Sequence, residues 1–240
     1  MSDERPYIAV LFIRLLLVGL FAAGFLIGCG EEGGPSGSSG GALDGLDLLG
    51  LEDGRSLVYI RIDSIRDSSF NLYVSTSYDT FTITGDLEDW AIGNNHQPII
   101  SLKVSDQSVI QNGYWPLTVG TPQITYLPVP PVMMPRQLSA TDSWGGYVPL
   151  LQVGLEDVQH LFYYSYFGFH HSKSYVAHPQ VTVPAGSFGA YQFDVRLYQR
   201  YDDTDPVAIV REYYVPNIGL VRLDISGGSF KRVLSLISYQ

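Results

Sequence analysis

Residues 191–198 read YQFDVRLY, and apolar and polar side chains alternate along this stretch without interruption. Successive side chains of an extended chain point to opposite faces, so this segment has one apolar face and one polar face. The apolar face carries Tyr191, Phe193, Val195 and Leu197. A pattern of this kind predicts a half-buried strand in an antiparallel sheet.

Three more strands are expected after this one, at 207–215, 220–225 and 230–239. The polar segment 201–206 separates the first pair. Pro216 and Asn217 suit the two central positions of a tight turn, Gly219 eases its exit, and the glycines at 227–228 supply the last turn. Connections this short favour antiparallel neighbours, so the carboxyl-terminal part is predicted to be a four-stranded meander.

The chain between residues 55 and 190 shows weaker signals of the same type. Segments rich in β-branched and aromatic residues predict strands at 57–65, 70–75, 80–84, 99–104 and 147–153. Prolines remove backbone donors from 121–136, which is therefore expected to be an extended crossing loop. The short segment 155–159 is the expected helix. The predicted fold class is all-β, a curved antiparallel sheet or half-barrel with at most one or two short helices.

The first 28 residues have the parts of a secretory signal. Arg5 and Arg14 lie on the amino side of an apolar run at 15–27, and Gly28 is a small residue at the cleavage point. The run is shorter than the roughly 20 apolar residues that cross a bilayer as a helix. An export signal is therefore the first interpretation, and an uncleaved membrane anchor is the alternative.

The residue after Gly28 is Cys29, the single cysteine of the chain. Leu26, Ile27, Gly28 and Cys29 resemble the lipobox of bacterial lipoproteins, in which Leu, an aliphatic or small residue, and Gly or Ala precede the cysteine. The resemblance implies cleavage between Gly28 and Cys29, diacylation of the Cys29 sulfur and anchoring through acyl chains, each buried methylene of which contributes about 0.8 kcal/mol. Gly30 stands where many inner-membrane lipoproteins have Asp, which implies the outer membrane, facing the periplasm.

The expected organisation follows from this anchor. Residues 1–28 form the signal peptide, and 29–54 form a flexible tether because Gly and Ser dominate its first half. Within it, 42–54 alternates Leu with Asp and Gly and could form one weak helical turn. Residues 55–240 form a single β domain. With Cys29 acylated, no thiol remains for a disulfide, so the domain must be stabilised by its core.

The charge balance restricts the class of partner. The chain carries 14 basic and 24 acidic side chains, a formal net charge of −10. Nucleic-acid affinity comes largely from clustered Lys and Arg that replace counterions, so we expect no nucleic-acid partner. The expected partners are the membrane, reached through Cys29, and an envelope protein.

Three motifs in the last quarter of the chain carry a second resemblance. They are VPAGSF at 183–188, YYVPNIGLVR at 213–222 and LISY at 236–239. They resemble the Val-Pro-Ala-Gly-Thr-Phe, Tyr-Ala-Pro-Gly-Val-Gly-Leu-Val-Lys and Ser-Tyr elements of bacterial envelope lipoproteins. Those families have a curved antiparallel sheet broadly similar to the lipoprotein carriers LolA and LolB. The resemblance implies the same sheet here, with Pro184 and Gly186 in a turn.

The histidines are the nearest approach to a metal site. Four of the five histidines lie within one stretch of the sequence: His160, His170, His171 and His178. On a strand, His170 and His171 point to opposite faces, and no cysteine or recurring carboxylate completes a ligand set. We therefore expect no metal.

Two acidic groups also invite a chemical interpretation. Asp202, Asp203 and Asp205 resemble part of a calcium loop, but Pro206 follows and no bidentate Glu lies at the right distance, so a solvated hairpin tip is expected. The second group is Glu156, Asp157 and His160. These three could act as acid and base across one helical turn, yet nothing supplies a nucleophile or an oxyanion hole. We expect no catalytic residue and no cofactor.

Residues 161–169 read LFYYSYFGF and are apolar on both faces of a strand. Phe162, Tyr164 and Tyr166 share one side. A strand of this kind is covered on both sides. Either a loop or helix of the protein covers it, or one face lines an apolar ligand cavity, in which tyrosine supplies both apolar and polar surface.

These observations predict a non-enzymatic protein of the bacterial cell envelope, anchored by Cys29, that acts as a binding or assembly module. The alternative is a carrier or sensor of an apolar ligand in a β-sheet cavity. A hydrolase built on scattered Asp and His is the third interpretation. The long helices that line the cavity of the carriers have no counterpart in the pattern, so the domain is expected to retain little lipid.

Overall fold

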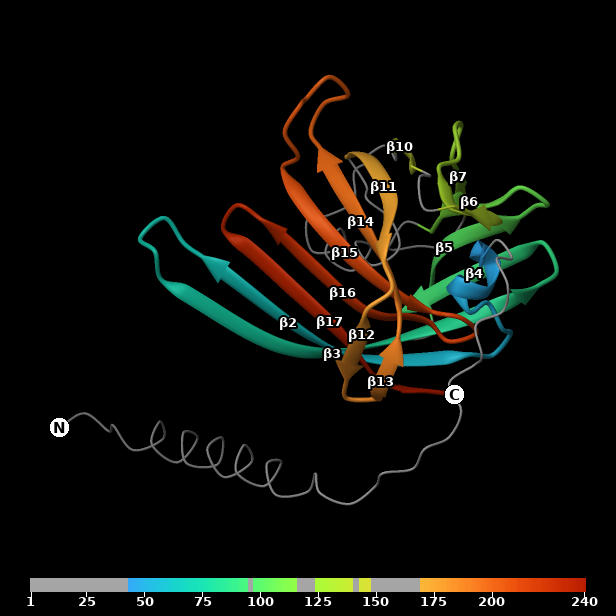
Figure 1. The fold of residues 1–240 in the computed structure, drawn as a ribbon, viewed down its shortest axis with the longest axis horizontal. Coiled ribbons are helices and arrows are strands. Elements are labelled where there is room, and N and C mark those ends of the chain that lie inside the picture. Colours follow the sequence, from blue (N-terminus) through green and yellow to red (C-terminus); the bar gives the residue numbers. More distant parts are fainter. Residues whose placement is uncertain (1–42, 95–96, 116–123, 140–142, 148–168) are drawn as a thin grey trace, which may run out of the picture. The chain divides into compact units, whose positions relative to one another are not determined.

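A broad antiparallel sheet forms most of the computed structural model, which describes residues 43–94, 97–115, 124–139, 143–147 and 169–240. In spatial order its strands are β10 (Ser143–Tyr147), β11 (His170–Ala177), β14 (Tyr191–Tyr198), β15 (Ala208–Val215), β16 (Gly219–Gly227), β17 (Phe230–Tyr239), β2 (Ser56–Arg66), β3 (Leu72–Asp86), β4 (Asp89–Asn94), β5 (Gln97–Val104), β6 (Ser108–Tyr114) and β7 (Thr125–Tyr126) (Figure 1). A further strand, β8 (Val132–Pro135), also pairs with β6. The sheet is curved and open at both ends, so the all-β prediction is confirmed.

The predicted carboxyl-terminal meander is present. β14, β15, β16 and β17 are neighbours in space in the order of the sequence, and every pair is antiparallel. The turn between β15 and β16 holds Asn217 at a φ of 63° and Gly219 at a φ of 104°. Asn and Gly adopt positive φ at low cost, which explains why this turn forms here.

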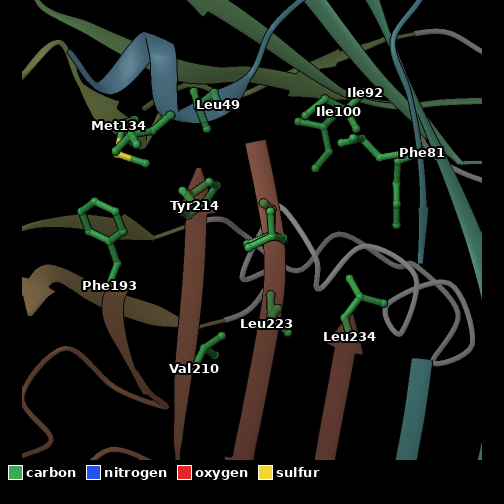
Figure 2. Packing of buried hydrophobic residues seen from close by; sticks show 14 of the residues in the cluster. Leu49, Phe81, Ile92, Ile100, Met134, Phe193, Val210, Tyr214, Leu223 and Leu234 are labelled. Atoms are coloured by element: carbon green, nitrogen blue, oxygen red, sulfur yellow. The ribbon is translucent and has the colours of Figure 1, made fainter. Parts of the chain in front are cut away.

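The core lies on one face of the sheet, which we call the inner face and define by Phe193, Val210, Leu223 and Leu234. All four are fully buried. Figure 2 shows them in one interior with Phe81, Ile92 and Ile100 from β3, β4 and β5. The alternation in β14 therefore has the predicted sense, with Phe193 and Val195 inward and Arg196 outward.

A short helix, α2 (Gly45–Leu49), completes the core. Asp44 caps it by accepting a hydrogen bond from the Leu46 N–H, and the Arg136 guanidinium donates to both Asp44 oxygens at 2.8 and 2.7 Å. Leu48 is fully buried. Residues 43–54 belong to the predicted tether 29–54, and backbone hydrogen bonds from Gly45 N–H to the Arg136 carbonyl and from Gly54 N–H to the Ile83 carbonyl, both 3.0 Å, hold them to the sheet.

Two further corrections concern strands. The predicted segments 70–75 and 80–84 are one strand, β3, which pairs with β2 over 11 residues without a register shift. The polar residues between them alternate faces, and the inward Asp79 is paired by Arg61. The predicted loop 121–136 contains β7 and β8, but both lie at β6 on the outer edge of the sheet, where missing donors are tolerated.

Smaller elements flank the sheet. β1 (Leu43–Asp44) pairs with β9 (Gln137–Leu138), and β12 (Gln180–Val183) pairs with β13 (Gly186–Gly189) around the predicted turn. β10 ends at Tyr147, where the predicted strand 147–153 was to begin; the rest of that segment, the predicted helix 155–159 and residues 1–42 lie outside the described residues. None of the described helices is long and apolar enough to cross a membrane.

Candidate functional site: an apolar cavity on the inner face

A cavity of about 500 Å³ opens on the inner face of the meander. Its apolar lining is Ile65, Phe169, Leu197, Val207, Ile225 and Phe230. Ala208 and Gly227 add small residues, and Gln199 and Arg232 add polar atoms. Natural ligand cavities measure roughly 300–1,000 Å³ and are mostly apolar with a few polar groups, so this cavity has the size and lining of a binding site.

The floor of the cavity is a row of neighbours across adjacent strands. Leu197 pairs with Ala208, Gly227 pairs with Phe230, and Phe230 pairs with Ile65. The cavity exists because the middle of this row is small. A Cβ on Gly227 would lie 2.7 Å from the Cβ of Ala208, so no larger residue fits between them.

Arg232 marks the polar side of the cavity. Its guanidinium donates to both Asp63 oxygens, at 2.5 Å from Nε and 2.8 Å from Nη2, and lies 5.2 Å from the centre of the Phe230 ring. Arg61 lies 3.4 Å from both Asp63 and Asp79. These two arginines and two aspartates form a charge-balanced chain across β17, β2 and β3.

A second ion pair lies on the same face, on β11 and β15. Lys173 Nζ is 2.5 Å from Glu212 Oε2, and both side chains are buried. The ammonium group lies 4.9 Å from the Tyr214 ring centre, 5.2 Å from Phe193 and 5.9 Å from Trp144. The inner-face charges named here therefore cancel, although the chain as a whole is strongly acidic.

His171 stands beside Lys173 on the inner face. Burial first, and then the Lys173 charge, lower the pKa of His171 to about 4 against the opposing effect of Glu212. The imidazole is therefore neutral at neutral pH. It adds no charge next to the cavity.

The residues singled out from the sequence are dispersed. His170 pairs with Tyr198 and His171 with Leu197, so the two histidines occupy opposite faces as predicted. The His178 ring lies 4.3 Å from the Tyr191 ring, and His160 lies outside the described residues. Within the described part of the chain, no three His, Cys, Asp or Glu side chains gather as a metal site.

The remaining residues singled out from the sequence form no separate site among the described residues. Asp203 accepts the Arg200 backbone N–H at 2.9 Å in an exposed loop, the expected hairpin tip. Gly28, Cys29, Glu156 and Asp157 lie outside the described residues. Of the aromatic run 161–169, Phe169 alone is described, and it lines the cavity.

Sequence reasoning missed the inner-face ions. Glu212 and Arg232 occupy positions that the alternation of their strands places on the apolar face, between Val210 and Tyr214 and between Phe230 and Leu234. A charge at a predicted core position is the signal that could have found them, because charges are almost never buried without a partner.

The fold and the cavity together define an all-β protein with a curved open sheet and an apolar inner cavity. No protein-family profile and no curated protein matches the sequence. Among the similar solved structures is a candidate lipoprotein of Parabacteroides distasonis, with 12% identity over 80% of this chain and 98% of that chain and a TM-score of 0.38. A β-barrel-like protein of a domain of unknown function from Brucella abortus has 10% identity over 79% of this chain and 98% of that chain, with a TM-score of 0.40. A LolA superfamily protein of Nitrosomonas europaea has 8% identity over 82% of this chain and 89% of that chain, with a TM-score of 0.34.

Proposed function

We propose that this protein is a non-enzymatic binding protein of the bacterial cell envelope, held at the membrane through Cys29, that takes an apolar ligand into the inner-face cavity. The observation that carries the proposal is the cavity itself, with about 500 Å³ and a lining dominated by aliphatic and aromatic side chains. This is the alternative that the aromatic run left open. We prefer the apolar-ligand function to the assembly module because the cavity is a defined binding site for such a ligand.

The charge distribution supports an apolar ligand. The arginines and the lysine of the inner face are each paired with a carboxylate, so they do not attract an anionic head group from within. Binding energy must then come from removal of apolar surface from water, at about 25 cal/mol per Å². An acyl chain or another elongated apolar molecule satisfies this requirement.

Binding is tested with dansyl-undecanoic acid, whose fluorescence rises in apolar surroundings, on a chain that starts at Ala42 and so retains α2. Ala208→Trp places an indole on the cavity floor and should abolish the fluorescence increase. Ile209→Trp is the matched control, because the next residue of β15 faces outward and should leave binding intact.

Native mass spectrometry of the same sample reports any lipid retained from the expression host. If the chain without substitutions neither retains lipid nor binds the probe, the proposal is contradicted and the assembly module becomes the preferred interpretation.

The anchor is tested separately. Cys29→Ala should leave an unprocessed precursor in the membrane, whereas the unchanged chain should carry two or three acyl chains at Cys29. Intact-mass analysis that finds an unmodified mature chain beginning elsewhere contradicts the lipid anchor. Sedimentation of separated membranes tests the expected outer-membrane location.

A further inference from the structure

One half of β3 has a strand neighbour on one side only. Residues 72–82 pair with β2, but β4 pairs only with residues 81–86. Among the described residues, the stretch 72–80 therefore has a free edge, at the end of the β2–β3 hairpin (Figure 1). Leu72, Tyr73 and Val74 expose 59–60% of their surfaces and Tyr78 exposes 67%. No residue that the structure describes pairs with this edge.

The edge also lacks the features by which proteins normally block strand pairing. Charged side chains, proline, bulges and short length are the usual protections. Residues 68–78 read SSFNLYVSTSY and contain no charged residue, proline or glycine. The pairing of β3 with β2 has no register shift, so no bulge turns the edge away. An uncharged edge of this length without a bulge is a template for another strand.

We propose that this edge pairs with the same edge of a second copy, antiparallel and two-fold symmetric about Ser75. In this arrangement Leu72 faces Tyr78 of the other copy and Val74 faces Thr76. An aliphatic–aromatic pair and a pair of β-branched residues both stabilise antiparallel strands. The sequence 72–78 is thus complementary to itself, which singles out a second copy from among other strands.

The charge of the molecule favours the same partner. Two copies that each carry a net charge of −10 repel one another over most of their surfaces. The uncharged stretch 68–78 lets two copies approach with little of this repulsion. Pairing closes both free edges at once, as a two-fold contact requires.

The first test measures the mass of the full chain, extracted from membranes in a mild detergent and analysed by native mass spectrometry. The unchanged chain should give the mass of two copies. V74K/T76K should give a single copy, because two lysine pairs then face each other across the axis. V74K/T76E should restore two copies, because each lysine now faces a glutamate. Val74 and Thr76 are exposed, so neither double variant disturbs the core.

The second test is cross-linking in the membrane. Ser75→Cys places two thiols at the axis, where paired strands bring Cα atoms 4.5–5.5 Å apart, within disulfide range. Mild oxidation should give a covalent dimer. Ser68→Cys is the control, because this exposed residue lies in the hairpin turn beyond Leu72, which itself stands about 20 Å from its equivalent across the axis.

A single-copy mass together with equal cross-linking of the two cysteine variants overturns the proposal. Equal weakening of association by V74K/T76K and V74K/T76E also overturns it, because a strand from a different protein would not distinguish the two variants in this way.

Discussion

Lys173 Nζ lies 2.5 Å from Glu212 Oε2, and neither side chain exposes more than 5% of its surface. Loss of one partner leaves the other charge buried, which typically costs 3–5 kcal/mol. We expect Glu212→Leu to lower the free energy of unfolding by about 3–5 kcal/mol, measured by urea denaturation. Lys173→Met combined with Glu212→Leu should restore most of this loss. A double variant as unstable as the sum of the two single variants would contradict the pairing.

The pH dependence of stability should report His171. Its pKa is about 4 in the folded protein, below the ordinary value of 6.5, so the unfolded chain binds the proton more readily. The contribution of the neutral His171 to the free energy of unfolding is therefore fully present above pH 6.5 and is lost as the pH drops from 6.5 toward 4. The His171 contribution to this loss should be about 2 kcal/mol between pH 7 and pH 5.

Urea titrations at the two pH values measure this contribution. His171→Gln should remove it, whereas His170→Gln, on the opposite face, should keep it. An unchanged pH dependence in His171→Gln contradicts the assignment.

The faces of β14 can be tested at two adjacent residues. Phe193 is fully buried, with the Trp144 and Tyr214 rings each 5.8 Å away. Phe193→Ala should therefore destabilise the protein by about 3–5 kcal/mol. Gln192→Ala, on the outer face, loses one hydrogen bond to Asp194 and should stay within about 1 kcal/mol. Equal losses in thermal or urea unfolding would mean that the register is wrong.

Two glycines of positive φ can be compared, Gly50 at the C-cap of α2 and Gly54 in the turn that follows. Gly50 has a φ of 58°, and a Cβ there would lie 2.5 Å from the Ile218 carbonyl carbon. Gly50→Ala should cost about 2–4 kcal/mol, because it adds a clash to the left-handed backbone.

Gly54 has a φ of 79° but open space around it, so Gly54→Ala should cost only about 1 kcal/mol. Both losses are read from urea denaturation. Similar small losses would show that α2 is not fixed to the sheet.

The carboxyl-terminal strands were predictable because each depends on local alternation that continues through short turns. Residues 230–239 were predicted as a strand, and β17 occupies these residues. The single strand β3 was not predictable, because its inward Asp79 is compatible with a strand only through Arg61 on β2. The sequence indicated only one weak helical turn at 42–54, where α2 lies, because the cap of this helix depends on Arg136, far along the chain.

The cavity could not be derived from local pattern. Ala208 and Gly227 are unremarkable in their own segments and leave space only because β15 and β16 place them together. The inward Glu212 and Arg232 contradicted the alternation rule and were paired by Lys173 and Asp63, residues of other strands. The acylation of Cys29 stays a prediction from sequence resemblance.

Because β17 pairs with β2, the sheet can be completed only after the end of the chain has been synthesised. Asp63 and Arg232 stand 169 positions apart in the chain, yet their side chains join in the middle of the sheet. A chain that emerges from a ribosome or a translocation pore therefore presents β2 long before the strand that completes its edge exists. During that interval β2 lacks its neighbour on the β17 side, and non-local pairing of this kind is slow. Until β17 is made, the open edge of β2 must be kept from pairing with other chains.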